Sequence, residues 1–445
     1  MNKRILAVIA VLLLALPFTA VFAQEGTLVD VIAGSADHTV LAAAVEAAGL
    51  TETLATGEFT VFAPTDAAFT AALEALGLAA EDLLASTDLL TSVLTYHVVA
   101  GTVTSDMVAS GQVPTVNGAS LTVSVSDAGV MVDQANVVAV DLMASNGVVH
   151  VVDSVLLTLN VDAAAVSGDI AAAGSSTVFP LAERLLADFV AEGYAGSMII
   201  DSIGSGGGLE RFCVEAASDI ANSSRAIRDS EVEACAALAT PRTPIEVRVG
   251  TDALAVVVSA ENDFATDVTL AELALIFGSA ANWSDVRAEW PAEPIQRFIP
   301  GTDSGTFDYF VEAVFEDDSA PILAMDPTTS EDDNVLVQGV QGSPFAVAFF
   351  GYAYYAENAD TLKALSVEGI EPNAANVDAA TYPLARPLFM YTDAGIVAEK
   401  PQVGQFLAYA LSNVNNVVVE VGYFPAPAAD LFAAKVAILK LMLGM

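Results

Sequence analysis

The sequence has 445 residues, which is enough for two or three domains that each bury a core of their own. Its 56 acidic residues outnumber its 15 basic residues, and the formal net charge is −41. A strongly negative chain repels polyanions, so we expect neither nucleic acid nor an anionic membrane surface to be a partner.

Residues 1–23 are predicted to form a signal peptide. Lys3 and Arg4 give a basic start, residues 5–16 are apolar, and residues 21–23 provide a cleavage site. The apolar stretch is short for a membrane span, and no Cys stands at the cleavage site to carry a lipid. We expect the mature chain to be exported to the periplasm, the cell surface or the extracellular space.

Residues 24–158 are predicted to form a first domain of the α+β class. This unit holds 16 acidic residues and no Lys or Arg. Helical apolar spacing comes first, and alternating or β-branched stretches broken by Gly and Asn follow. Helices are expected at 40–50, 67–76 and 89–96, and strands at 120–125, 137–140 and 148–157.

Three motifs make this first unit resemble a fasciclin-type domain over its whole length. They lie at 60–69, 96–99 and 146–153. The resemblance implies a compact extracellular module that contacts a cell surface or matrix partner and has no catalytic activity. His97 and His150 flank apolar stretches, so we expect both to be structural.

A short linker is expected at 159–168, and residues 169–445 are predicted to form a second unit. Strand-like apolar runs alternate with helical ones, which favours a doubly wound α/β architecture, and the length favours two lobes. Strands are expected at 245–259, 346–355 and 388–392, and helices at 181–192, 209–217, 270–277, 307–316 and 403–411.

Three segments of the second unit, 174–177, 204–208 and 303–306, are rich in hydroxyls or glycine and lead into helical patterns. Helix starts bind anions through unpaired N–H groups and the positive end of the helix dipole. Ordinary capping or a flexible turn would explain any one segment, but three together favour a single oxyanion site. The candidate ligands are Ser176, Thr177, Val178, Ser205, Gly206, Ser304, Gly305 and Thr306.

Arg225, directly after Ser224, is the expected cation of this site. A guanidinium can hold an oxyanion through two parallel hydrogen bonds. The alternative is a solvated surface arginine, which is the usual state of this residue type. No Gly-Lys-Ser or Gly-Lys-Thr follows the glycine run, so a nucleotide-binding loop is excluded.

With these segments the second unit resembles the phosphate-binding proteins of ABC-type uptake systems. The matching stretches lie in the family's order at 173–180, 204–213, 219–227, 300–310 and 330–340. The resemblance implies a two-lobed periplasmic-binding-protein-like domain with a hinge of crossing strands. It also implies inorganic phosphate, or a related oxyanion, held in the cleft and passed to an ABC transporter permease, without a cofactor or catalytic residues.

Two positions depart from the best-known branch of that family. Ser224 stands where that branch has Asp, and Pro300 stands where it has Arg. Arg225 would then supply the guanidinium. A carboxylate that accepts a proton would favour phosphate over sulfate, which carries none. Asp303 is the nearest candidate for this acceptor, and Asp252 is a second one.

Cys213 and Cys235 are the two cysteines of the sequence, 22 residues apart. In an exported chain such a pair predicts a disulfide, which would stabilise the fold by about 3 kcal/mol. Two buried thiols are the alternative.

An enzyme and a metal protein are both disfavoured by the sequence. All three histidines, His38, His97 and His150, lie in the first unit, so the anion site cannot use a Ser-His-Asp triad. Clusters with zinc spacing and calcium-binding Asp-rich loops are also missing. We expect an exported phosphate-binding protein with a fasciclin-type surface or matrix tether. The alternative is an adhesion protein whose second unit senses phosphate or another oxyanion.

Overall fold

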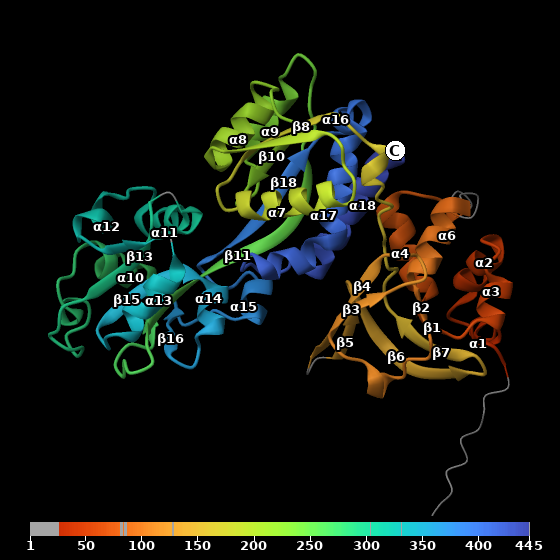
Figure 1. The fold of residues 1–445 in the computed structure, drawn as a ribbon, viewed down its shortest axis with the longest axis horizontal. Coiled ribbons are helices and arrows are strands. Elements are labelled where there is room, and N and C mark those ends of the chain that lie inside the picture. The colour runs from red at the N-terminus through yellow and green to blue at the C-terminus, as the bar shows by residue number, and fades with distance from the viewer. Residues whose placement is uncertain are drawn as a thin grey trace, which may run out of the picture.

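The structure is a computed structural model that describes residues 26–80, 83, 87–126, 129–302, 304–330 and 332–444. The predicted signal peptide lies outside these residues. Figure 1 shows three bodies in a row. The first lobe of the C-terminal unit lies in the middle, between the N-terminal unit and the second lobe of the C-terminal unit. Within the described ranges, no helix combines the length and the apolar character that a membrane crossing requires.

The N-terminal unit is built on a curled sheet in the strand order β2-β1-β7-β6-β5-β4-β3, with helices packed against one end. The parallel pair β1 and β7 is almost fully buried, which explains its continuous apolar sequence. The helices are α1 (Leu28–Ala33), α2 (Thr39–Ala47), α3 (Thr51–Thr56), α4 (Asp66–Leu76) and α6 (Thr87–Tyr96), with a 3-10 turn at Ser105–Met107; the strands are β1 (Phe59–Pro64), β2 (Val98–Ala100), β3 (Gly111–Pro114), β4 (Ser120–Ser126), β5 (Gly129–Val132), β6 (Ala135–Ala144) and β7 (Gly147–Val152).

His97 and His150 are structural, as predicted. The buried His97 ring donates from Nδ1 to the Val93 carbonyl at 2.8 Å and accepts the Leu156 N–H at Nε2. Burial lowers the pKa of His97 to about 4, so the ring is neutral. The predicted strand over 148–157 is too long, because β7 ends at Val152.

The C-terminal unit has two lobes joined by the long strand β11. The strand order is β14-β13-β15-β11-β18-β10-β8-β9. The first part of β11 pairs with β18 in lobe 1, and its last residues pair with β15 in lobe 2. Lobe 1 comprises residues 169–253 and 385–442, and lobe 2 comprises residues 254–384. Strand β11 runs from lobe 1 into lobe 2, and β18 begins at the same boundary, which is where the resemblance places the hinge.

The elements of lobe 1 follow the expected alternation of strands and helices. They are β8 (Asp169–Gly174), α7 (Phe179–Ala191), β9 (Ser197–Ser202), α8 (Gly204–Cys213), β10 (Ile220–Ser223), α9 (Asp229–Ala236), β11 (Ile245–Ser259), β18 (Ala385–Thr392), α16 (Ala394–Glu399), α17 (Pro401–Glu420) and α18 (Ala428–Met442).

Lobe 2 corrects one prediction. The strand expected over 346–355 ends at Gly351, and helix α14 begins at Tyr352. The elements of lobe 2 are β12 (Asp267–Val268), α10 (Leu270–Gly278), a 3-10 turn (Trp283–Asp285), β13 (Gln296–Pro300), α11 (Gly305–Phe315), α12 (Ala320–Ala324), β14 (Thr328–Ser330), α13 (Asp333–Gln341), β15 (Ala346–Gly351), α14 (Tyr352–Glu357), β16 (Leu362–Ala364), β17 (Ser366–Val367) and α15 (Ala374–Asp378).

The segment expected as a linker packs against lobe 1. Leu159 and Ala163 are buried, and the Asp162 N–H donates to Gln405 Oε1 of α17 at 2.7 Å. One continuous cluster of buried apolar side chains runs from the N-terminal unit into lobe 1. The two units therefore share a core instead of hanging on a free chain.

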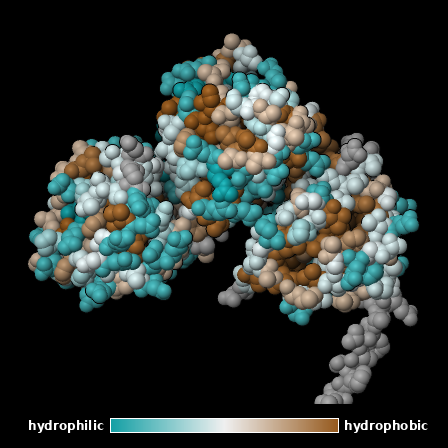
Figure 2. Space-filling model, viewed as in Figure 1, coloured by the Kyte–Doolittle hydropathy of each residue, from teal (hydrophilic) through white to brown (hydrophobic). Residues whose placement is uncertain are grey.

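The surface of the N-terminal unit exposes hydrophobic residues over its sheet (Figure 2). Val138 and Val140 of β6 and Val125 of β4 are about half exposed. Exposed apolar patches on a soluble domain mark surfaces that contact other molecules.

Candidate functional site

A cleft of about 660 Å³ lies between the two lobes. The loops that follow β8, β9 and β10 line it from lobe 1, and helix α11 lines it from lobe 2. Five predicted ligand residues are among its lining residues: Ser176, Ser205, Gly206, Ser224 and Arg225. The two predicted lobe 1 segments therefore meet at the carboxyl ends of the lobe 1 strands, which is where ligands bind in α/β sheets. The other described candidates do not line the cleft: Thr177, Val178, Ser304, Gly305 and Thr306.

The first loop is shaped by Ser175. Its buried Oγ accepts the N–H groups of Thr177 at 3.2 Å and Val178 at 3.4 Å. Helix α7 then begins at Phe179, with Pro180 in its first turn as predicted. Ser176 lines the cleft, whereas the Val178 side chain is fully buried in the core. This side of the site is therefore fixed by packing before any ligand arrives.

The glycine run forms the first turn of α8 rather than a separate loop. A Cβ at Gly208 would lie 2.4 Å from Gly174 Cα, so only glycine lets the helix start approach β8 this closely. Ser205 Oγ accepts the Ser224 N–H at 3.1 Å and lies 3.2 Å from Ser224 Oγ. The first turn of α8 and the loop after β10 that carries Arg225 are thus joined at the cleft.

The third segment caps α11 of lobe 2. Ser304 Oγ accepts the Thr306 N–H at 3.2 Å at the start of this helix. A Cβ on Gly305 would lie 2.8 Å from Thr177 Oγ1 and 3.0 Å from Ser176 Oγ, so the two lobes touch here. Asp303, the first candidate for proton acceptor, lies outside the described residues.

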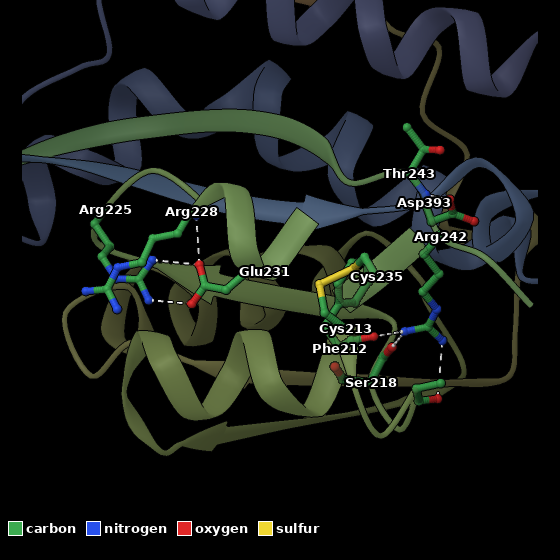
Figure 3. Close-up of a disulfide and its surroundings, with 11 residues drawn as sticks. Phe212, Cys213, Ser218, Arg225, Arg228, Glu231, Cys235, Arg242, Thr243 and Asp393 are labelled. Carbon is green, nitrogen blue, oxygen red and sulfur yellow. Dashed lines mark hydrogen bonds and ion pairs between the residues drawn. A yellow bond between two sulfur atoms is a disulfide. The ribbon is translucent and has the colours of Figure 1, made fainter. Parts of the chain in front are cut away.

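Arg225 lines the cleft at its rim, but its guanidinium is already paired. Nη1 and Nη2 donate to the two carboxylate oxygens of Glu231 at 2.9 and 2.7 Å, as Figure 3 shows. Burial raises the pKa of Glu231, but the hydrogen bonds from Arg225 and from the Arg228 N–H outweigh it and lower the pKa. Both members of the pair therefore stay charged near neutral pH.

Arg386 is a second arginine of the cleft, and sequence reasoning missed it as a ligand. It lies on β18 where the hinge strands cross, and its side chain is only 7% exposed. Nη2 donates to Thr177 Oγ1 of lobe 1 and to the Gly305 carbonyl of lobe 2. The guanidinium also lies 4.0 Å from the centre of the Tyr309 ring. One cation thus joins both lobes at the floor of the cleft.

Asp252 of β11 stands opposite Arg386 and holds it. Its Oδ2 accepts the Arg386 Nε–H at 3.1 Å. Burial raises the pKa of Asp252, while Arg386 opposes this change. Asp252 is not one of the residues that line the cleft. It therefore orients the guanidinium from the side away from the cleft. Among the described residues, Nη1 of Arg386 has no hydrogen-bond partner.

Carboxylates line the mouth of the cleft on the lobe 2 side. Asp308 and Glu312 of α11 and the nearby Asp317 face the same space as Arg225 and Arg228. Acids beside an oxyanion site repel a fully ionised ligand and can accept a proton from a partly ionised one. The site therefore combines hydroxyls, helix starts, arginines and potential proton acceptors.

The predicted disulfide is present between Cys213 and Cys235. It joins the end of α8 to α9 (Figure 3), so it supports both the glycine-rich helix start and Glu231. Groups of His, Cys, Asp or Glu arranged to hold a metal ion were not found in the described part of the chain.

The fold and the motifs place the chain in known families. Residues 161–414 match the model of the PBP superfamily domain, and residues 36–158 match the model of the Fasciclin domain. The chain therefore belongs to the PBP superfamily and carries a fasciclin domain in front of its two-lobed binding domain.

Three similar proteins each match about three fifths of the chain. Protein SphX of Synechococcus elongatus is 42% identical over 276 residues, which cover 60% of this chain and 80% of the relative. Phosphate-binding protein PstS of Staphylococcus saprophyticus is 30% identical over 277 residues, or 61% of this chain and 84% of the relative. A crystal structure of a possible phosphate binding protein from Planctomyces limnophilus is 35% identical, with a TM-score of 0.58, and the match covers 62% of this chain and 99% of that one.

Proposed function

We propose that the chain binds inorganic phosphate in the cleft between its lobes and delivers it to an ABC-type uptake system. The observation that carries this proposal is Arg386 at the floor of the cleft, which contacts Thr177 of lobe 1 and Gly305 of lobe 2. The same cleft is lined by the hydroxyls of Ser176, Ser205 and Ser224. An anion at this point would contact both lobes, so its binding energy would favour the closed arrangement. Relatives that are named phosphate-binding proteins support the choice of anion.

In this proposal the ligand is held mostly by neutral donors. Ser176, Ser205 and Ser224 supply hydroxyls, and the starts of α8 and α11 supply N–H groups. Arg386 supplies the charge from a site that is shielded from solvent, where charge-assisted hydrogen bonds are strongest. The net charge of −41 then matters little, because salt screens it beyond about 8 Å.

Selectivity between phosphate and sulfate would come from a proton acceptor at the cleft. With Asp252 turned toward Arg386, the candidates among the described lining residues are the carboxylates of Asp308, Glu312 and Asp317. Phosphate near neutral pH can donate a proton to a carboxylate, whereas sulfate has no proton to donate and would be repelled by its charge.

We also assign the fasciclin domain the role of a surface or matrix tether. It lies on the side of lobe 1 away from lobe 2, so it leaves the cleft open (Figure 1). Its sheet exposes apolar residues to solvent, including Val138 at 57%. A domain that has such a surface and takes no part in the cleft is suited to attach the chain to a cell surface or matrix.

Calorimetric titration of the full chain with phosphate, sulfate and arsenate, at one pH on each side of neutrality, tests this function. We expect phosphate to bind and sulfate to be rejected at both pH values. Equal affinities for phosphate and sulfate would mean a general oxyanion binder. Absence of any binding would contradict the proposal and leave an adhesion protein as the better interpretation.

A further inference from the structure

The fasciclin domain and lobe 1 pack directly against each other at their junction. Helix α18 packs against α4, as Figure 1 shows, and Leu439 of α18 meets Phe69 and Leu76 in a small apolar cavity. Lys435, with a side chain only 6% exposed, donates to the Leu157 carbonyl at 3.2 Å and lies 3.9 Å from the Asp133 carboxylate. The surfaces of the two domains beside this contact therefore hold a constant spacing.

A groove of about 780 Å³ runs along this junction. One wall is fasciclin sheet and loop, with Gln112 and Asn117, and the other is α17, with Asn413 and Asn416. Gln112 Nε2 donates across it to Asn416 Oδ1 at 2.8 Å. This volume is within the range of small-molecule sites, which occur preferentially where domains meet.

The groove is lined by amides that keep one polar atom each for a ligand. Asn117 and Asn413 donate their Nδ2 groups to the carbonyls of Ser92 and Tyr409, which leaves their Oδ1 atoms as acceptors. Asn416 uses Oδ1 for Gln112, which leaves Nδ2 as a donor. Among the described residues none of these remaining atoms has a hydrogen-bond partner.

The Lys435 ammonium at the floor of the groove adds unused donor capacity. It has three N–H donors, and it makes one hydrogen bond, to a carbonyl, and one long ion-pair contact. A buried ammonium that is only partly satisfied favours a ligand with an acceptor oxygen. The Tyr409 ring lies among the same lining residues and offers an aromatic face.

We propose that this junction groove binds a neutral oligosaccharide chain of a wall or matrix glycan, and this inference rests on the proposed tether role. Sugar hydroxyls both donate and accept, so they match a mixture of amide donors and acceptors. The carboxylates at the groove, those of Asp162 and Glu192, disfavour an anionic ligand, although Asp162 Oδ1 also accepts the Ala165 N–H at 3.0 Å. The tether site is therefore composite, formed jointly by the fasciclin domain and lobe 1.

The test is a titration of the full chain, followed by saturation-transfer NMR, with cellohexaose, chitohexaose and maltohexaose in turn. We expect one of them to bind, and the double variant Asn413→Leu/Asn416→Leu to weaken that binding at least tenfold. Gln341→Leu is the matched control, because Gln341 is an amide of lobe 2 that donates to a threonine hydroxyl, as Gln112 does. It should leave sugar binding unchanged.

Phosphate titration and thermal unfolding of the same samples separate the possible failures. If the double variant loses sugar binding but keeps its phosphate affinity and unfolding temperature, the groove is supported as the sugar site. Failure of all three hexasaccharides at millimolar concentration, or equal sugar affinity in the double variant, overturns the inference while phosphate capture stands. If the chain binds a sugar but is not retained at the cell surface, the tether role fails and the groove remains.

Discussion

Arg386 at the floor of the cleft and Arg225 at its rim are both paired with a carboxylate, but the two pairs leave different groups for a ligand. Glu231 takes both terminal nitrogens of Arg225. Asp252 accepts a hydrogen bond only from Nε of Arg386. Nη2 of Arg386 instead donates to Thr177 Oγ1 of lobe 1 and to the Gly305 carbonyl of lobe 2. The Arg386 side chain is also less exposed, 7% against 21% for Arg225.

Scarcity and neighbouring hydroxyls therefore do not identify a ligand arginine. Arg225 has both, but its charge is used to hold α9 against the cleft. Arg386 has an unfinished hydrogen-bond set in a buried position, which makes an anionic partner favourable. Four changes test whether the floor rather than the rim binds the anion.

The largest effect is expected from Arg386→Met. Removing the buried cation should weaken phosphate binding by about 2–5 kcal/mol, or roughly thirtyfold to several thousandfold, in calorimetric titration. Arg248→Met is the matched control, because Arg248 is also a buried arginine of the hinge strands but does not line the cleft. Since Arg386→Met leaves Asp252 unpaired, Arg386→Met/Asp252→Asn should restore stability without restoring affinity. Unchanged phosphate affinity in both Arg386 variants would remove Arg386 from the site.

The disulfide should have the next largest effect, and on stability first. Cys213→Ala/Cys235→Ala should lower the free energy of unfolding by about 3 kcal/mol, which urea denaturation would measure. Because the bond joins α8 to α9, phosphate affinity should fall too, but less than in Arg386→Met. An affinity loss as large as that of Arg386→Met would mean that the rim carries the binding.

Gly305→Ala tests the contact between the lobes at the floor. The added Cβ would meet Thr177 Oγ1 at 2.8 Å and push the lobes apart beside Arg386. We expect phosphate affinity to fall by about 1–2 kcal/mol, roughly five- to thirtyfold, with little change in the unfolding temperature. Gly351→Ala is the control, since its Cβ would meet nothing within 4 Å. Equal effects of the two substitutions would show that closure at Gly305 is unimportant.

The smallest effect is expected at the rim. Arg225→Gln should weaken phosphate binding by less than about 1 kcal/mol, because the cation is already paired with Glu231.

The pKa of Glu231 is lowered in the folded chain, so the pair stabilises the fold above the ordinary pKa of 4.5 and this contribution is lost as pH falls below it. Unfolding temperatures measured from pH 7 to pH 3 should therefore drop less steeply in Glu231→Gln. An identical slope would contradict this role of the pair.

Much of the site was predictable, because its lobe 1 residues belong to local patterns. Ser176, Ser205 and Ser224 each lie next to a strand end or helix start that the apolar spacing reveals. The capping role of Ser304 and the place of Pro180 in α7 follow from the same local rules. The disulfide followed from two cysteines in a chain that the sequence predicts to be exported.

The rest depends on contacts between distant residues. Arg386 becomes a floor residue only because β18 pairs with β11 and sets it opposite Asp252, 134 positions away. Likewise the packing of α18 on the fasciclin domain joins Lys435 to Leu157 across 278 positions. Periodicity in the sequence indicates neither pairing. The available signals for the floor were an arginine just before the predicted strand 388–392 and the similarity of this stretch to the family.

A crystal structure of the full chain grown with phosphate tests the central claim most directly. It should show the anion within hydrogen-bond distance of Arg386 and of the hydroxyls of Ser176 and Ser205, with Arg225 still paired to Glu231. Phosphate bound to Arg225 at the rim without any contact to Arg386 would contradict the account.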